Sequence, residues 1–202
     1  YICEIVEIRS DIVVVSILDS FKGNNEPPID IILYQGIAKG DKMDFIIQKS
    51  TEIGVKEIYP IITNRTVVKI KEKKKEQKKV ERWMTIAEEA AKQSKRDTIP
   101  IVNNIITYNE MIDSLKGEEN IIVPYEMERK NTLKEVLKDI KNEKIHIIIG
   151  PEGGFEEEEI DAIINIGGKS ITLGPRIFRT ETAGIVVMSV VLYELGDIGV
   201  RV

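Results

Sequence analysis

Short apolar runs and helical patterns alternate along most of this chain. From Ile29 onward, segments rich in isoleucine and valine are typical of buried strands, and the residues between them carry apolar positions at the spacing of helices. The predicted strands lie near 29–35, 57–63, 100–105, 120–125, 145–149 and 169–173. The predicted helices lie near 41–53, 78–95, 108–115, 131–140, 156–166 and 181–195. This alternation predicts an α/β fold around a mostly parallel sheet.

The first residues of the chain follow a different pattern. Residues 1–20 form two apolar runs around Arg9-Ser10-Asp11, which predicts a hairpin-like pair of strands. The next residues are rich in turn formers and predict a linker between domains. Because the chain opens without methionine inside an expected strand, we interpret it as a fragment of a longer protein. The expected parts are a small β unit at 1–22, a linker at 23–28 and an α/β domain at 29–202.

A glycine-rich loop follows the predicted strand at 145–149, within the stretch IHIIIGPEGGFEEEEIDAIINIGG. Open α/β sheets bind ligands at the carboxyl ends of strands, where glycines admit close backbone approach and helix N-termini offer free N–H groups. The consecutive glutamates Glu156 to Glu159 would repel a polyanion there, and neither common phosphate-binding fingerprint is present. A neutral or cationic ligand fits this loop better. A plain strand-to-helix connection is the simpler alternative.

Two further segments have the form of a strand end beside a loop. Residues 173–184, LGPRIFRTETAG, join a predicted strand to the last helix, and residues 121–128, IIVPYEME, close another strand. Since the carboxyl ends of parallel strands meet at one edge of a sheet, we expect the three loops to share one site. The last helix is apolar on nearly all sides, so it is buried either within the chain's own core or partly against a second subunit.

Composition narrows the class of protein. With 202 residues, of which 42% are hydrophobic and 31% charged, the chain can bury one core and is expected to be a cytoplasmic protein without a membrane span. One cysteine, Cys3, and one histidine, His146, leave no ligand set for zinc and are most simply strand residues. The net charge of -5 argues weakly against a general nucleic-acid binder. The basic run at 71–79 is either a solvated surface segment or a contact to RNA.

Several motifs together resemble the RsmE family of ribosomal RNA methyltransferases. The resemblance is carried by IGPEGGF at 149–155 and LGPRIFRTETA at 173–183. Earlier segments agree with the family in the same order, namely KGDKMDFIIQKSTEIGV at 39–55, NRTVVK at 64–69, RWMTIAEEAAKQSKR at 82–96 and VPYE at 123–126. The resemblance therefore covers nearly the whole chain.

The resemblance implies a fold and an activity that periodicity does not supply. Members of the RsmE family have a SPOUT, or α/β-knot, fold in which the C-terminal segment threads through a loop as a trefoil knot. They bind S-adenosylmethionine in the knot without a metal, act as homodimers and methylate N3 of a specific uridine in the 16S rRNA of the 30S ribosomal subunit. They also carry an N-terminal PUA-like β-barrel, of which residues 1–22 would be a remnant.

S-adenosylmethionine suits the glycine loop, because it carries a sulfonium cation and no phosphate. The residues expected to bind it are Pro124, Glu126, Ile149, Gly150, Pro151, Glu152, Gly153, Leu173, Gly174, Ile177 and Thr180. Basic residues near strand ends are expected to contact RNA, namely Lys39, Lys42, Arg65 and Arg96.

The catalytic groups are expected just before the last helix. Uridine N3 is a poor nucleophile until it loses its proton, so Glu181 is the candidate base and Arg176 or Arg179 the candidate stabiliser of negative charge on the uracil oxygens. In the simpler alternative, Thr180 caps the last helix, and Glu181 complements the helix dipole and pairs with an arginine.

Two other classes of function compete with a methyltransferase. One is a non-catalytic RNA-binding module of the same fold, and the other is a Rossmann-like metabolic enzyme that uses a nucleotide cofactor. Retention of all three loops argues against the first, and the missing phosphate fingerprints argue against the second.

Overall fold

A sheet of parallel strands forms the centre of this computed structural model, which describes residues 1–68, 73–140 and 144–199. The strands are β1 (Ile2–Ile8), β2 (Val13–Asp19), β3 (Asp30–Gly36), β4 (Glu57–Ile62), β5 (Ile101–Val102), β6 (Ile106–Thr107), β7 (Ile121–Pro124), β8 (Lys144–Ile149) and β9 (Lys169–Ile171). The helices are α1 (Lys42–Ile53), α2 (Lys73–Gln93), α3 (Tyr108–Leu115), α4 (Leu133–Leu137), α5 (Glu157–Asn165) and α6 (Thr180–Glu194).

The strands of the central sheet lie in the order β5-β4-β3-β8-β7-β9, and β6 pairs with β4. Every pairing in this sheet is parallel. The apolar run of β8 is buried from Ile145 to Ile149, as expected for a strand that is covered on both faces. The predicted α/β fold with a mostly parallel sheet is therefore confirmed.

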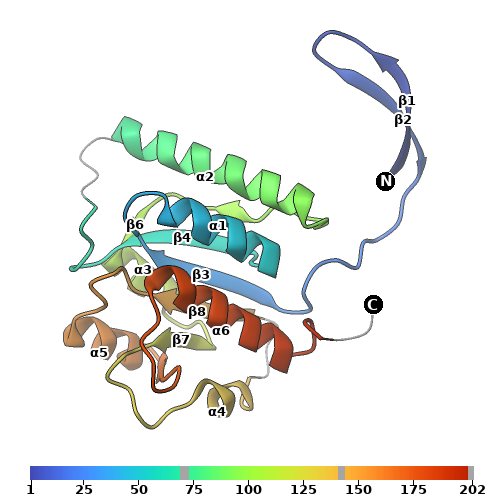
Figure 1. Cartoon of the computed structure of the whole chain (residues 1–202). Coiled ribbons are helices and arrows are strands. Elements are labelled where there is room, and N and C mark those ends of the chain that lie inside the picture. Colours follow the sequence, from blue (N-terminus) through green and yellow to red (C-terminus); the bar gives the residue numbers. More distant parts are fainter. Residues whose placement is uncertain (69–72, 141–143, 200–202) are drawn as a thin grey trace.

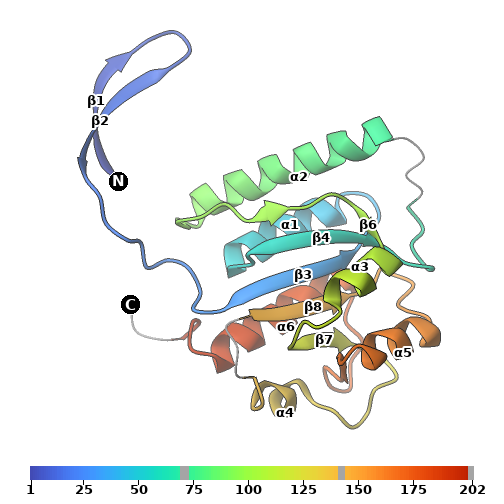
Figure 2. The same ribbon diagram turned by 180° about the vertical axis from the view of Figure 1, so that it is seen from behind.

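Helices cover both faces of the sheet (Figures 1 and 2). On the face seen in Figure 1, α1, α2 and α6 cover a core cluster that includes Leu33 and Ile147. On the face seen in Figure 2, α3 and α5 cover a second cluster that includes Tyr34 and Ile148. Neighbouring residues of one strand thus point into different clusters, which is why the strands have no polar face.

β1 and β2 form an antiparallel hairpin outside these layers, with a turn around Arg9-Ser10-Asp11. The hairpin projects away from the sheet in Figures 1 and 2, and every residue of its two strands is exposed. The segment predicted as a linker is fastened to the turn after α2. The Asn25 backbone N–H donates to Asp97 Oδ2 at 3.0 Å, and Glu26 Oε1 accepts from the Asp97 backbone N–H at 2.9 Å.

Several boundaries differ from the predictions. α2 begins at Lys73 rather than near 78, because lysine, glutamate and glutamine favour a helix even where no apolar stripe marks it. Lys71 and Glu72 of the basic run lie outside the described residues. The strand predicted over 100–105 is reduced to β5, and β6 follows separately. α4 is shorter than predicted, since a capping box at Thr132 starts it and its regular turns end after Leu137.

α6 crosses the sheet next to α1 and β8. Val187, Met188, Val191 and Leu192 are buried on it, whereas Tyr193 is 65% exposed. Among the residues that the structure describes, no helix combines the length and the apolar character needed to cross a membrane.

Candidate active site

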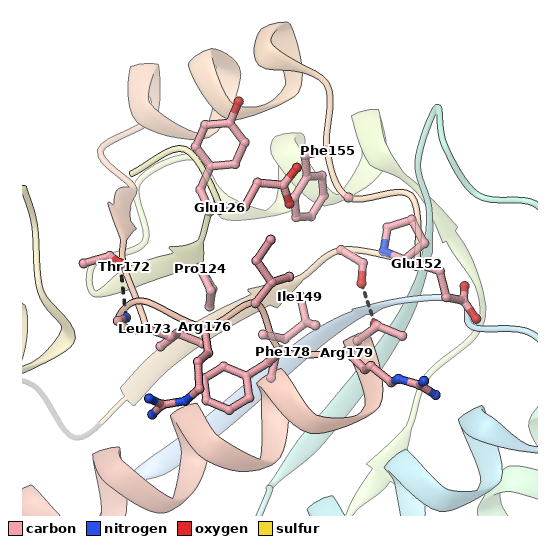
Figure 3. A pocket seen from close by; sticks show the side chains of 18 of the residues that line it. Pro124, Glu126, Ile149, Glu152, Phe155, Thr172, Leu173, Arg176, Phe178 and Arg179 are labelled. Carbon is pink, nitrogen blue, oxygen red and sulfur yellow. Dashed lines mark hydrogen bonds between the residues drawn. The ribbon is translucent and has the colours of Figure 1, made fainter. Parts of the chain in front are cut away.

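A cavity of about 920 Å³ lies at the carboxyl ends of β7, β8 and β9 (Figure 3). The three segments that follow these strands form most of its wall, as expected for a ligand site in an open parallel sheet. The lining residues are Lys42, Pro124, Tyr125, Glu126, Arg129, Ile149, Gly150, Pro151, Glu152, Gly154, Phe155, Thr172, Leu173, Gly174, Pro175, Arg176, Ile177, Phe178, Arg179, Thr180 and Ala183.

Hydrogen bonds from the end of β9, from the residue after it and from the start of α6 join this part of the chain to both other segments. The Tyr125 N–H donates to the Ile171 carbonyl at 3.0 Å, and the Thr172 N–H donates to the Asn131 carbonyl at 2.8 Å. On the opposite side, the Thr180 hydroxyl donates to the Gly150 carbonyl at 2.6 Å. The three walls are therefore held in one arrangement by the chain itself.

The middle of the cavity is apolar. In Figure 3 the side chains of Pro124, Ile149, Leu173 and Phe178 gather at its centre, and Phe155 lies on the upper wall beside Glu126. Such a slot suits a flat ring or an aliphatic chain. The three loops that line it carry backbone N–H and carbonyl groups of the kind that can hydrogen-bond a heterocycle.

Charged groups of both signs stand at the mouth. The Lys42 Nζ donates to Glu152 Oε1 at 3.2 Å, and the Lys39 backbone N–H donates to the same oxygen at 3.0 Å. Burial raises the pKa of Glu152, but these hydrogen bonds outweigh burial and hold it below its ordinary value. Arg176 and Arg179 are exposed and extend their guanidinium groups to opposite sides in Figure 3.

Thr180 and Glu181 occupy positions that differ from the sequence-based hypotheses. Arg179 is the N-cap residue of α6 and gives no side-chain cap, so the prediction that Thr180 caps this helix is wrong. Thr180 instead uses its hydroxyl on Gly150. Glu181 is not among the lining residues, and its carboxylate lies within 3.3 Å of Lys42 and 4.0 Å of Arg179. Its surroundings are those of a structural ion pair.

All residues expected to bind the cofactor line the cavity except Gly153. A side chain at Gly153 would not enter the cavity, because its Cβ would lie 2.9 Å from the Cβ of Arg65. The glycine is needed for contact with the loop that follows β4. Gly153 therefore packs against Arg65 rather than lining the cavity, and its expected approach to a ligand stays a prediction.

The four basic residues expected at an RNA face have different surroundings. Lys39 and Arg65 are exposed, and the Arg65 Nη1 donates to the Gly153 carbonyl at 3.2 Å. Lys42 lies in the cavity mouth. The Arg96 side chain is only 4% exposed and pairs with Glu26 at 2.6 Å. Because its guanidinium also donates to two backbone carbonyls, Arg96 is unavailable to RNA and that prediction is corrected.

Sequence reasoning missed several lining residues. Phe155 and Phe178 lie inside the motifs that carried the resemblance, and Arg129 lies just past the third loop. The rule that placed the site at three strand ends would have found the two phenylalanines. No spacing signal marks Arg129. Within the described ranges, no group of three or more His, Cys, Asp and Glu side chains is arranged to hold a metal ion.

Comparison with known proteins agrees with this arrangement. The model of an RNA methyltransferase domain matches residues 25–192. The ribosomal RNA small subunit methyltransferase E of Bacillus subtilis is 34% identical over 197 residues, which are 95% of this chain and 77% of that protein. The chain belongs to the RsmE family. The Mesomycoplasma hyopneumoniae RsmE protein is 38% identical over 86% of this chain and 74% of its own length.

A solved RsmE structure has the same architecture. The crystal structure of the Neisseria gonorrhoeae RsmE protein bound to S-adenosyl methionine superposes with a TM-score of 0.86 at 33% identity. The superposition covers 97% of this chain and 79% of that one. A Legionella pneumophila methyltransferase in complex with the same cofactor gives a TM-score of 0.83 at 34% identity, over 95% of this chain and 77% of that one.

Proposed function

We propose that this RsmE protein transfers a methyl group from S-adenosylmethionine to N3 of a uridine in 16S rRNA of the small ribosomal subunit. The observation that carries the proposal is the cavity at the carboxyl ends of β7, β8 and β9, whose loops hold the family motifs. The Neisseria gonorrhoeae relative that binds S-adenosyl methionine has the same fold at 33% identity, which supports the choice of cofactor.

The lining residues fit this cofactor. The apolar slot of Pro124, Ile149, Leu173 and Phe178 would accommodate adenine, and backbone groups of the glycine-rich loop would be available to hydrogen-bond it. Glu126 and Glu152 supply negative charge at the cavity, which suits a ligand with a sulfonium and an ammonium group. When bound, S-adenosylmethionine supplies an electrophilic methyl group and a neutral thioether leaving group.

The protein's task is to orient N3 and to stabilise the uracil anion. Arg176 and Arg179 are exposed at the cavity, where their guanidinium groups can donate to the uracil oxygens as N3 loses its proton. The N3–carbon bond then forms while the carbon–sulfur bond breaks. We assign Glu181 to support of Lys42 and Arg179, because its carboxylate lies outside the cavity wall. N3 loses its proton to solvent at the open mouth of the cavity before the methyl group is transferred.

The fold of this domain is proposed to be the SPOUT trefoil knot. The segment between β9 and α6 lies between two other loops of the chain, with backbone bonds to Tyr125 and Asn131 on one side and the Thr180 bond to Gly150 on the other. These contacts support threading of the C-terminal segment through the loop after β7. In this arrangement, the knotted segments form the wall of the cofactor cavity.

We further propose a homodimer with an RNA-binding surface made by Lys39, Lys42 and Arg65. The half-buried Ile185, Val186 and Val190 and the exposed Tyr193 of α6 give an apolar surface that a second subunit would cover. Residues 1–22 are proposed to belong to a PUA-like β domain, joined by the linker at 23–28 to the SPOUT domain at 29–202. The exposed apolar side chains of the hairpin, including Ile5 and Ile8, support that assignment.

Methyl transfer to 30S subunits that lack the modification tests the function. We expect label from S-adenosylmethionine in 16S rRNA, and we expect nucleoside analysis to yield 3-methyluridine. Label at another atom of the nucleoside would overturn the N3 assignment. Calorimetric titration with S-adenosylmethionine, NAD and ATP distinguishes the alternatives, since an RNA-binding module would bind none of them and a metabolic enzyme would prefer a nucleotide.

A further inference from the structure

A fully buried glutamine connects the centre of the sheet to the cavity wall. Gln35 lies on β3 between Pro60 of β4 and Ile149 of β8, and its relative exposure is 0%. Its Nε2 donates to the Gly36 carbonyl and to Thr180 Oγ1, each at 3.0 Å. Gln35 is not itself a lining residue, so it acts on the cavity only through these neighbours.

The partners of Gln35 fix which way its amide group is turned and which atom donates in each hydrogen bond. The Gly36 carbonyl can only accept, so the amide nitrogen must face it, and the same nitrogen then donates to Thr180. The Thr180 hydroxyl keeps its own proton for the Gly150 carbonyl, which also can only accept, at 2.6 Å. The series Gln35, Thr180, Gly150 therefore fixes the orientation of a wall side chain and links two of the cavity loops.

Packing alone does not explain a glutamine at this position. Gln35 Oε1 is buried and has no hydrogen-bond partner among the described residues, which is unfavourable for folding. An apolar side chain of similar size would fill the same space without that penalty. Exceptions of this kind concentrate at functional sites. We therefore attribute the presence of the amide group to the two hydrogen bonds that its nitrogen donates, to the Gly36 carbonyl and to Thr180.

The end of β3 also supports the glycine-rich loop directly. A Cβ on Gly36 would lie 2.4 Å from the Pro151 nitrogen and 2.8 Å from the Gly150 carbonyl carbon. The loop thus rests on the backbone of Gly36 with no room for a side chain. Gln35 donates to the carbonyl of this same glycine. One amide group therefore hydrogen-bonds both Gly36, which contacts the glycine-rich loop, and Thr180 in the cavity wall.

We propose that Gln35 is a positioning residue of the cofactor cavity, which holds the Thr180 hydroxyl and the Gly150 backbone in the geometry that binds S-adenosylmethionine. The inference rests on the proposed function for the identity of the ligand. The hydrogen-bonded series Gln35, Thr180, Gly150 lies in the cavity walls. Its loss therefore changes ligand affinity more than it changes the stability of the fold.

Substitution of Gln35 by methionine tests the proposal. Gln35→Met keeps the side-chain length and removes both the donor and the unpartnered oxygen, so we expect the melting temperature to stay unchanged or rise. The dissociation constant for S-adenosylmethionine, measured by calorimetry, should increase about tenfold. Gln35→Leu repeats the measurement if the methionine variant does not fold. Ser50→Ala is the matched control. Ser50 is also fully buried, its hydroxyl has no hydrogen-bond partner among the described residues, and it lies outside the cavity wall.

Variants at Thr180, the next residue of this hydrogen-bonded series, complete the test. Thr180→Val should weaken binding by a similar factor, Thr180→Ser should restore it, and the double variant Gln35→Met/Thr180→Val should bind little worse than either single variant. Wild-type affinity in the Gln35 variants, or losses that multiply in the double variant, would overturn the positioning role. A wild-type protein that does not bind S-adenosylmethionine would instead refute the proposed function.

Discussion

The Lys42 ammonium lies 3.3 Å from Glu181 Oε2, across the gap between the first turn of α1 and the first turn of α6. This oxygen is buried and receives no bond of hydrogen-bonding geometry from the described residues, so the contact is an ion pair. The same ammonium bonds Glu152, and this bond is the main reason why the pKa of Lys42 is raised. Lys42 therefore links two carboxylates at the cavity mouth, and Glu181 faces a cation rather than the cavity.

Glu181→Gln is expected to lower the turnover of methyl transfer by less than about tenfold, because the carboxylate does not reach the cavity. The variant should lose about 0.5–1 kcal/mol of stability, since it removes negative charge from the first turn of α6. Both quantities are measured on the same preparation, by transfer to 30S subunits and by thermal unfolding.

A catalytic base at Glu181 would give a different result. Turnover would then fall by about a thousandfold or more with unchanged affinity for S-adenosylmethionine, and activity would recover partly as the pH approaches the pKa of uridine N3. That outcome would return Glu181 to the catalytic residues and show that the cavity rearranges when RNA binds.

Arg65 and Arg96 form a matched pair for testing the proposed RNA-binding surface, because one is exposed and the other is buried. Arg65→Ala should flatten the slope of log affinity for RNA against log salt by about one unit while the melting temperature stays unchanged. Arg96→Ala should leave that slope unchanged but lower the free energy of unfolding by about 2–3 kcal/mol, because it leaves Glu26 without its partner. A reduced salt slope for Arg96→Ala would contradict the buried role.

The contrast between these two arginines marks a limit of sequence reasoning. Arg65 follows β4 and Arg96 follows α2, each within a family motif, and basic character near a strand end assigned both to RNA. The partner of Arg96 is Glu26, 70 residues away in the segment interpreted as a linker, and local patterns carry no information on such a pair. By contrast, β3, α1 and β8 were predicted within a few residues, because long apolar stripes specify burial directly.

In the candidate site too, some features could be predicted from the sequence and others could not. The three loops were found because strand ends of a parallel sheet converge, which is a rule of topology. Which residues at a strand end face the cavity depends on contacts far along the chain, so Gly153 and Glu181 were placed in the site although neither lines the cavity. Gln35 was missed because a lone glutamine in an apolar strand leaves no periodic signal.

Glu26 should make stability depend on acid pH. Burial raises the pKa of Glu26, but Arg96 and the Thr98 N–H outweigh burial and hold the pKa below its ordinary value in the folded state. A carboxyl group whose pKa is lower in the folded than in the unfolded state stabilises the fold above the unfolded value. This contribution is lost as the pH falls through the folded pKa. Glu26→Gln should therefore be less stable than wild type at neutral pH, with a difference that shrinks below about pH 4.5.

Urea unfolding at several pH values measures this difference, and Glu7→Gln is its control. Glu7 also accepts two hydrogen bonds from one arginine, Arg9, and these lower the pKa of Glu7. Unlike Glu26, Glu7 lies on the fully exposed hairpin. Solvent screens that pair, so no change in stability is expected. A Glu26→Gln difference that stays constant from neutral to acid pH would show that the ion pair does not control the acid dependence.

Gly153→Ala is expected to weaken S-adenosylmethionine binding indirectly, by pushing the loop after β4 away from the glycine-rich loop. The added Cβ would lie 2.9 Å from Arg65 Cβ and 3.2 Å from the Arg65 carbonyl oxygen, closer than side chains normally approach. If Arg65 Cβ is the obstacle, Arg65→Gly in the same protein removes it and should restore much of the lost affinity. Calorimetry on the two single variants and the double variant gives the coupling between the sites. If the loss in Gly153→Ala is the same with and without the Arg65 side chain, the glycine is required by the ligand itself, and the cavity extends farther along this loop than the structure indicates.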